Sequence, residues 1–131
     1  MRTFMAAALA LGVLGTSAPV LAHHAFAAEF DRNKPITLVG KLSKVEWVNP
    51  HTWFHLDVTD SSGKVVTWRV EGGAPNQLMR RGWNRNSLKL GEQVTIEGFR
   101  ARTGEPIAAG SQIKTADGKV FGAASSANAS N

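Results

Sequence analysis

Hydrophobic and polar residues alternate most regularly between Thr52 and Thr59. Phe54, Leu56 and Val58 share one side of an extended chain, because successive side chains of a strand point to opposite faces. This segment is therefore predicted to be a strand with one buried face. The residues on the opposite side are His51, Trp53, His55, Asp57 and Thr59. Asn49-Pro50, just before the strand, is typical of a turn.

The same alternation returns in Val65–Glu71, which is predicted to be the next strand. Its inward positions are Val66, Trp68 and Val70, and Ser61-Ser62-Gly63 supplies the hairpin loop between the two strands. The outward positions are Val65, Thr67, Arg69 and Glu71.

An earlier strand is predicted over Ile36–Asn49, and its inward side changes part-way along. The apolar residues of one parity are Ile36, Leu38 and Leu42, and those of the other are Val45 and Trp47. A change of parity within one strand indicates a bulge or bend, here near Gly40–Lys44. Long, bent strands of this kind are what a small closed barrel needs to turn its corners.

After the third strand, Pro75 suits the first position of a short helix, because its missing N–H costs nothing there. The helix is predicted over Asn76–Arg81, and Gly82 is a natural stop. Trp83 is expected to pack back on the body of the domain. A fourth strand follows at Gln93–Arg102.

Gly104–Gly110 is predicted to be a loop. Beyond it, Gln112–Ala116 and Lys119–Phe121 flank Asp117-Gly118, a strong hairpin signal. Three strands, a short helix and further strands are the element order of a mostly all-β, small OB-like antiparallel β-barrel. Another small antiparallel barrel or a sandwich is the alternative.

The 131-residue chain suits one domain, flanked by two segments outside the fold. Residues 1–22 combine Arg2, the apolar run Phe4–Leu14 and the small-residue site Val20-Leu21-Ala22, which predicts a cleaved signal peptide. The apolar run is shorter than the ~20 residues of a membrane span, and no later segment is apolar enough for one. The domain is predicted over 23–122, with a disordered tail over 123–131.

Several short motifs along the chain resemble those of one family. They are His23-His24-Ala25-Phe26, Glu29-Phe30-Asp31, Val45-Glu46-Trp47, Asn49-Pro50-His51, Pro75-Asn76 and Arg80-Arg81-Gly82-Trp83. Together they resemble the exported bacterial domain-of-unknown-function family 6152. The resemblance implies a small β-rich exported domain, and it implies no activity and no catalytic residue.

The amino-acid composition and the missing motifs exclude several classes of site and enzyme. The chain has no Cys, which excludes disulfides, thiol catalysis and thiolate metal sites. Zinc-protease, serine-hydrolase and phosphate-loop motifs are missing from the sequence. Asp57 and Glu71 face outward on their strands and are expected to be solvated. The net charge of +5 is modest for a nucleic-acid binder, so the expected partner is a periplasmic ligand or protein.

The histidines suggest a metal site. Cleavage after Ala22 would make His23 the N-terminal residue, so that its α-amine and imidazole could chelate one copper ion, with His24 adding a second ring. His51 or His55 could be the distant ligand, but not both, because four residues along a strand span roughly 13 Å. The alternative is that these histidines are ordinary terminal and surface residues.

The outer face of strands two and three suggests a binding surface instead. His51, Trp53, His55, Thr67 and Arg69 would lie there, and an exposed Trp beside an Arg can stack on a sugar or a base. Alternatively, the arm His23–Asn33 covers Trp53 through Phe26 and Phe30, which are spaced to lie on one side of a short helix. We therefore expect a non-enzymatic exported binding module. A copper-binding protein is the first alternative, and a copper-dependent enzyme is the second.

Overall fold

The hairpin that alternation predicts is present in the computed structural model, which describes residues 25–129. Its strands are β2, Trp53–Thr59, and β3, Val65–Glu71. Phe54, Leu56 and Val70 are fully buried, so the predicted inward positions are confirmed.

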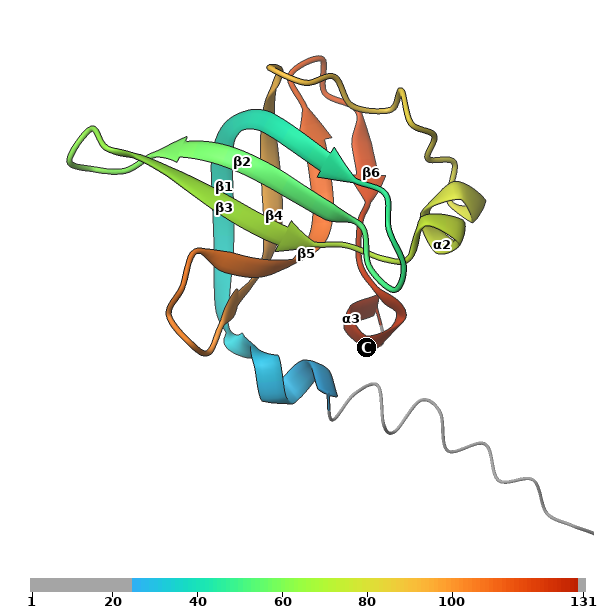
Figure 1. The fold of residues 1–131 in the computed structure, drawn as a ribbon, viewed down its shortest axis with the longest axis horizontal. Helices are drawn as coiled ribbons and strands as arrows, with labels where there is room; N and C mark the ends of the chain where they lie inside the picture. Colours follow the sequence, from blue (N-terminus) through green and yellow to red (C-terminus); the bar gives the residue numbers. More distant parts are fainter. Residues whose placement is uncertain (1–24, 130–131) are drawn as a thin grey trace, which may run out of the picture.

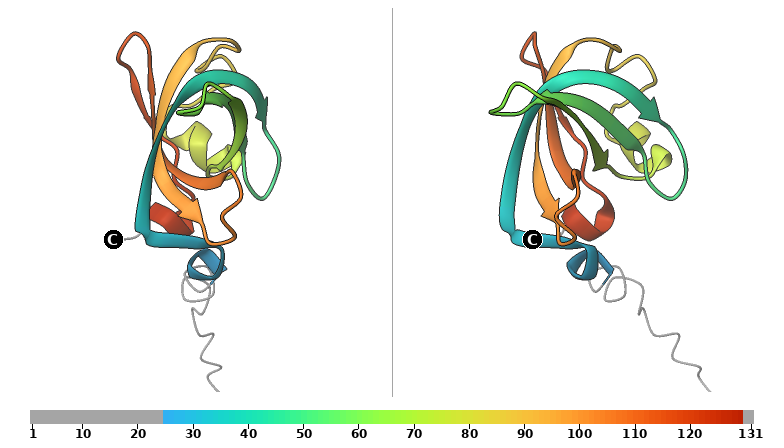
Figure 2. Two further views of the ribbon diagram at one scale, coloured as in Figure 1. Left: turned by 90° about the vertical axis from the view of Figure 1, so that its left-hand side faces the viewer. Right: turned by 60° about the vertical axis from the view of Figure 1, so that its left-hand side comes forward.

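The longest strand, β1, covers Phe30–Glu46 and curves around the domain (Figure 2). It pairs with β2 along one edge and with β4, Gln93–Ala101, along the other. The register between β1 and β2 shifts between Leu42 and Lys44. This bulge is the one that the parity change of the sequence predicts.

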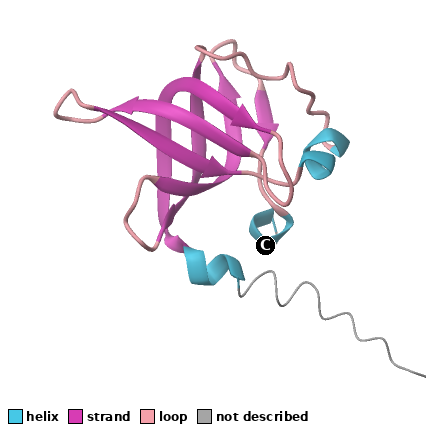
Figure 3. Ribbon diagram, viewed as in Figure 1, coloured by secondary structure: helices cyan, strands magenta, loops and turns pink. Residues whose placement is uncertain are grey.

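The remaining strands close the barrel. β5 covers Ile107–Thr115 and β6 covers Val120–Gly122. The sheet order is β3-β2-β1-β4-β5-β6, and a parallel pairing of β3 with β5 joins its two sides (Figure 1). The single helix between β3 and β4 is α2, Pro75–Arg80 (Figure 3). This order is that of an OB-like barrel, as predicted.

One segment differs from its prediction. Gly104–Gly110 is not a loop throughout, because β5 begins at Ile107. Ile107 pairs with Arg69 and Ala109 pairs with Glu71 on the parallel neighbour β3. The pairing joins residues far apart in the chain, so the local Gly and Pro content did not reveal it.

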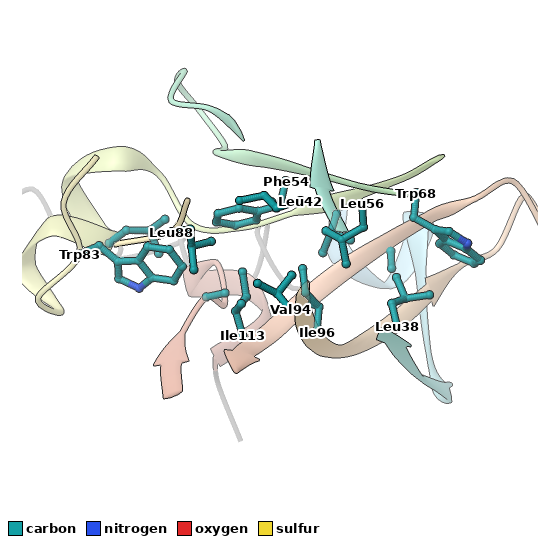
Figure 4. Close-up of a cluster of buried hydrophobic side chains, with 14 residues drawn as sticks. Leu38, Leu42, Phe54, Leu56, Trp68, Trp83, Leu88, Val94, Ile96 and Ile113 are labelled. Atoms are coloured by element: carbon teal, nitrogen blue, oxygen red, sulfur yellow. The ribbon is translucent and has the colours of Figure 1, made fainter. Parts of the chain in front are cut away.

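The core fills the barrel between the sheet and the chain that follows α2 (Figure 4). Trp83 is 3% exposed, and its indole Nε1 donates a hydrogen bond to the Gly122 carbonyl at 2.9 Å. Its ring centroid lies 5.5 Å from that of Phe54. The expected docking of Trp83 on the domain is therefore confirmed. The members of this core that Figure 4 labels are Leu38, Leu42, Phe54, Leu56, Trp68, Trp83, Leu88, Val94, Ile96 and Ile113.

A second, smaller cluster holds the N-terminal arm. Residues 25–29 are helical, and Phe26 and Phe30 are buried with their ring centroids 5.2 Å apart. Phe26 also meets the edge of Phe99 on β4. The two phenylalanines therefore dock the arm on the barrel, as their spacing predicts.

The C-terminal segment packs on the same end of the barrel. Ala123 is fully buried, and Asn128 in the short helix α3, Ser126–Ala129, donates its Nδ2 to the Gly110 carbonyl at 3.1 Å. The predicted disordered tail over 123–131 is therefore wrong for residues 123–128. Small residues such as Ala and Ser give a segment low complexity, yet they also fit tightly against a sheet. Residues 130–131 lie outside the described part.

The predicted signal peptide, residues 1–22, also lies outside the described residues, as do His23 and His24. Within residues 25–129, no helix has the length and apolar character needed to cross a membrane.

Candidate functional site

The five residues predicted to form a binding face fall into separate arrangements. His55 lies beside Glu46, with 2.7 Å between Nε2 and Oε2. Thr67 donates its hydroxyl to Oδ1 of Asp57 at 2.7 Å. The side chains of His55 and Thr67 therefore already have polar partners on the sheet surface. Trp53, Arg69 and His51 make other contacts.

The Glu46 carboxylate also accepts a hydrogen bond from Nζ of Lys44 at 2.8 Å. The hydrogen bond from Lys44 is the largest cause, and the one from His55 the next, of a pKa for Glu46 lowered from 4.5 to about 2. Three charged or polar groups thus form a surface cluster over β1 and β2. The negative charge of the Glu46 carboxylate offsets the positive charge of Lys44.

Trp53 and Arg69 form a stacked pair. The guanidinium carbon of Arg69 lies 4.6 Å from the centroid of the Trp53 ring, which is within the range of a cation–π contact. Trp53 is half-buried and also lines a pocket of about 240 Å³ together with Phe30 and Ile107. The arm borders this pocket through Ala28, yet it leaves Trp53 partly exposed.

His51 lies at the turn before β2 and faces the end of β3. Its Nδ1 is 3.1 Å from the carbonyl oxygen of Gly72. A carbonyl oxygen can only accept a hydrogen bond, so Nδ1 carries the proton. In the neutral ring this leaves the lone pair on Nε2, which is the nitrogen able to accept a proton or a metal ion.

The prediction that Glu71 is solvated is wrong. Alternation places it on the outward side of β3, but it is only 8% exposed. Burial raises the pKa of Glu71, the charge of nearby His51 opposes this, and the charge of Glu29 raises the pKa further. The Oε1 atom of Glu71 lies 3.4 Å from Nδ1 of His51. The sequence feature that could have marked Glu71 was its place at the end of a predicted strand, directly before Gly72 and Gly73.

His51 and Glu71 line one pocket of about 340 Å³ between the arm and the C-terminal segment. Phe26 and Phe30 contribute apolar surface from the arm, and Glu29 contributes a second carboxylate. Ala25, the first described residue, is also part of the lining. Because Glu29 and Phe30 line the Trp53 pocket as well, the two hollows flank the same arm.

The predicted metal ligands are only partly described. His23 and His24 lie outside the described residues, and His51 lies in the pocket next to Glu71. Within residues 25–129, no group of three or more His, Asp or Glu side chains is arranged to hold a metal ion. His55 contacts Glu46 through its Nε2 atom.

The solved structures that are similar to this chain in fold include the following two. One is the mitochondrial single-stranded DNA binding protein Rim1 from S. cerevisiae, with a TM-score of 0.49 and 12% identity over 63% of this chain and 93% of that one. The other is the N-terminal domain of PriB protein from Thermoanaerobacter tencongensis, with a TM-score of 0.40 and 22% identity over 64% of this chain and 97% of that one. The OB-like fold of the present chain is defined by its own strand order.

No curated protein matches the chain in sequence. The sequence model of a family of unknown function, DUF6152, matches residues 10–111, which is most of the chain. That match agrees with the resemblance carried by the short motifs. The chain belongs to the DUF6152 family of unknown function.

Proposed function

We propose that this protein is an exported, non-enzymatic binding module whose ligand stacks on the Trp53–Arg69 pair. The observation that supports this most is the partial exposure of Trp53 beside a pocket of about 240 Å³. A ring that is held by Arg69 at 4.6 Å and still reaches solvent offers a rigid, flat contact surface. Because little side-chain freedom remains to be lost, binding there costs little conformational entropy.

The chemistry of this surface is suited to flat or ring-shaped groups. Aromatic side chains stack on sugars and bases, and a neighbouring guanidinium adds hydrogen-bond donors. Export of the chain would favour a saccharide, a peptide or a protein over nucleic acid. His51 lies at the turn before the same strand and could contact a ligand that extends toward it.

The test is a titration of the mature protein with panels of oligosaccharides and short peptides, followed by tryptophan fluorescence and calorimetry. Trp53→Ala and Arg69→Ala should each abolish binding of any ligand found. Thr67→Ala is the matched control, because Thr67 lies on the same face but is engaged with Asp57. Full affinity in the Trp53→Ala variant would reject this surface.

Copper binding is the second candidate function, and it has its own supporting observation. Ala25, two residues after His23, lines the same pocket as His51. The neutral His51 ring has its lone pair on Nε2, because Nδ1 donates to Gly72. An N-terminal His23 could supply an α-amine and an imidazole, with His24 nearby in sequence, and such nitrogen ligands suit Cu(II). A copper-dependent enzyme activity would also depend on this copper site.

Calorimetric titration of Cu(II) into two forms of the protein tests the copper proposal. In the mature form His23 has a free α-amine, whereas one added residue ahead of it converts that amine to an amide. Binding should weaken greatly in the extended form and in His51→Ala, and His55→Ala is the control. Equal, weak binding by the mature and extended forms would reject an N-terminal copper site and leave the Trp53–Arg69 surface unaffected.

A further inference from the structure

We propose that the pocket lined by His51 and Glu71 binds a small organic ligand that carries a protonated amine. This inference adds a second site to the proposed binding module, on the other side of the arm from the Trp53–Arg69 pair. The cavity has a volume of about 340 Å³, and its wall contains a buried carboxylate. Cavities of this size lie within the range of small-molecule sites.

Two carboxyl groups line the cavity. Glu71 is 8% exposed, and Glu29 on the arm lines the same cavity. The nearest cation-forming group to Glu71 in the described part of the chain is Nδ1 of His51, at 3.4 Å. That nitrogen is closer to the Gly72 carbonyl, at 3.1 Å, so its single N–H is shared with a better-placed acceptor.

A buried carboxylate without a well-placed counter-charge is unfavourable, because burial removes it from water. An ammonium group in the cavity would supply up to three N–H donors and a full positive charge. It would therefore complete the surroundings of Glu71, whereas an anionic ligand would be repelled.

The rest of the lining favours an organic cation over a hydrated metal ion. Phe26, Phe30 and Pro50 present apolar surface, which suits an alkyl or aryl body attached to the amine. A divalent ion prefers several oxygen or nitrogen ligands around it. At about 30 Å³ per atom, as for liquid water, the cavity would hold roughly ten non-hydrogen atoms.

The side chain of His51 is 33% exposed, so the cavity can be reached from solvent on that side. A ligand entering there would place its amine toward Glu71 and its apolar body toward the arm. The arm is held in place by Arg102, whose Nε donates to the Ala27 carbonyl at 2.7 Å. The cavity is therefore part of the folded domain and does not require the arm to move.

The experiment is calorimetric titration of the mature protein with three probes of equal chain length: hexylamine, 1,6-diaminohexane and hexanoate. Both amines should bind and hexanoate should not. Glu71→Gln preserves the shape of the side chain and should weaken amine binding at least tenfold. Glu97→Gln is the matched control, since Glu97 is an exposed strand acid bonded to Gln112 outside this cavity.

Glu29→Gln is the second variant, because Glu29 is exposed and its replacement should leave folding intact. It should weaken the diamine more than the monoamine. Amine binding that is unchanged in both variants would overturn the proposal. Binding of Cu(II) with no binding of either amine would overturn it in favour of a metal site. Absence of amine binding together with intact Trp53-dependent ligand binding would overturn it while leaving the proposed function standing.

Discussion

Trp53 and Glu71 are direct cross-strand partners on β2 and β3, yet their side chains have opposite surroundings. The Trp53 ring reaches solvent and carries the Arg69 guanidinium at 4.6 Å. The Glu71 carboxylate is buried in the pocket that also contains His51. Paired residues on two neighbouring strands thus contribute to different sites: Trp53 to a surface suited to stacking, and Glu71 to a pocket suited to a cation.

Export should leave a mature chain that begins at His23, because Val20-Leu21-Ala22 is a small-residue cleavage site after a short apolar run. The intact mass of the protein recovered from the periplasm measures this directly. Retention of residues 1–22 would contradict the prediction, and it would remove the free α-amine on which the copper proposal depends.

Leu56→Ala should lower the free energy of unfolding by ~2–5 kcal/mol, because Leu56 is fully buried in the barrel core. Thr67→Ala, on the outer face, should lower it by only about 1 kcal/mol, the value of one hydrogen bond. Urea unfolding of the two variants and the wild type provides the comparison. Similar losses in both would mean that the two faces of the hairpin are wrongly placed.

The Glu46 carboxylate should titrate with a pKa of about 2, which a carboxyl-detected NMR titration can follow. Because the folded pKa lies below the ordinary value of 4.5, the associated stabilisation is present above pH 4.5 and is lost as the pH falls through about 2. Lys44→Met combined with His55→Gln should return the pKa toward 4.5. An unchanged pKa in that double variant would exclude these two partners as the cause.

Removal of residues 123–131 should destabilise the barrel, since this segment supplies hydrogen bonds to distant parts of the chain. The Ala123 carbonyl accepts from the N–H of Gly73 at 2.8 Å, and the Ala124 carbonyl accepts from Nη1 of Arg81 at 2.5 Å. A loss of about 1 kcal/mol per hydrogen bond is expected in thermal or urea unfolding.

Asn128→Ala is the milder comparison for that truncation, because it removes only the side-chain bond to the Gly110 carbonyl. Its effect should be clearly smaller than that of the truncation. A truncated chain as stable as the full one would show that the C-terminal segment does not contribute to the fold.

Local patterns predicted much of the barrel but little of the pocket. Alternation in β2 and β3 placed Leu56 and Val70 in the core, and the parity change in β1 marked the bulge at Leu42. These features depend on side chains a few residues apart. The pocket depends on which segments cover the sheet, and a pattern within one strand carries no information about its cover.

Glu71 shows this limit most clearly. Alternation correctly places it on the outer side of β3, opposite Trp53, but that side is covered at its end by the arm and the C-terminal segment. The parallel pairing of Glu71 with Ala109 is equally hidden from local reasoning. Both features arise from contacts between residues that are distant in the chain.

The two ends of the described chain meet at one end of the barrel, where Nη2 of Arg32 donates to the Ala127 carbonyl at 2.9 Å. The β2–β3 hairpin loop projects from the opposite side (Figure 1). A circularly permuted form of residues 25–129, with its two ends joined by a short linker and the chain reopened at Ser61-Ser62, should therefore keep the barrel. Surface immobilisation or dye labelling through that loop would leave both hollows beside the arm accessible.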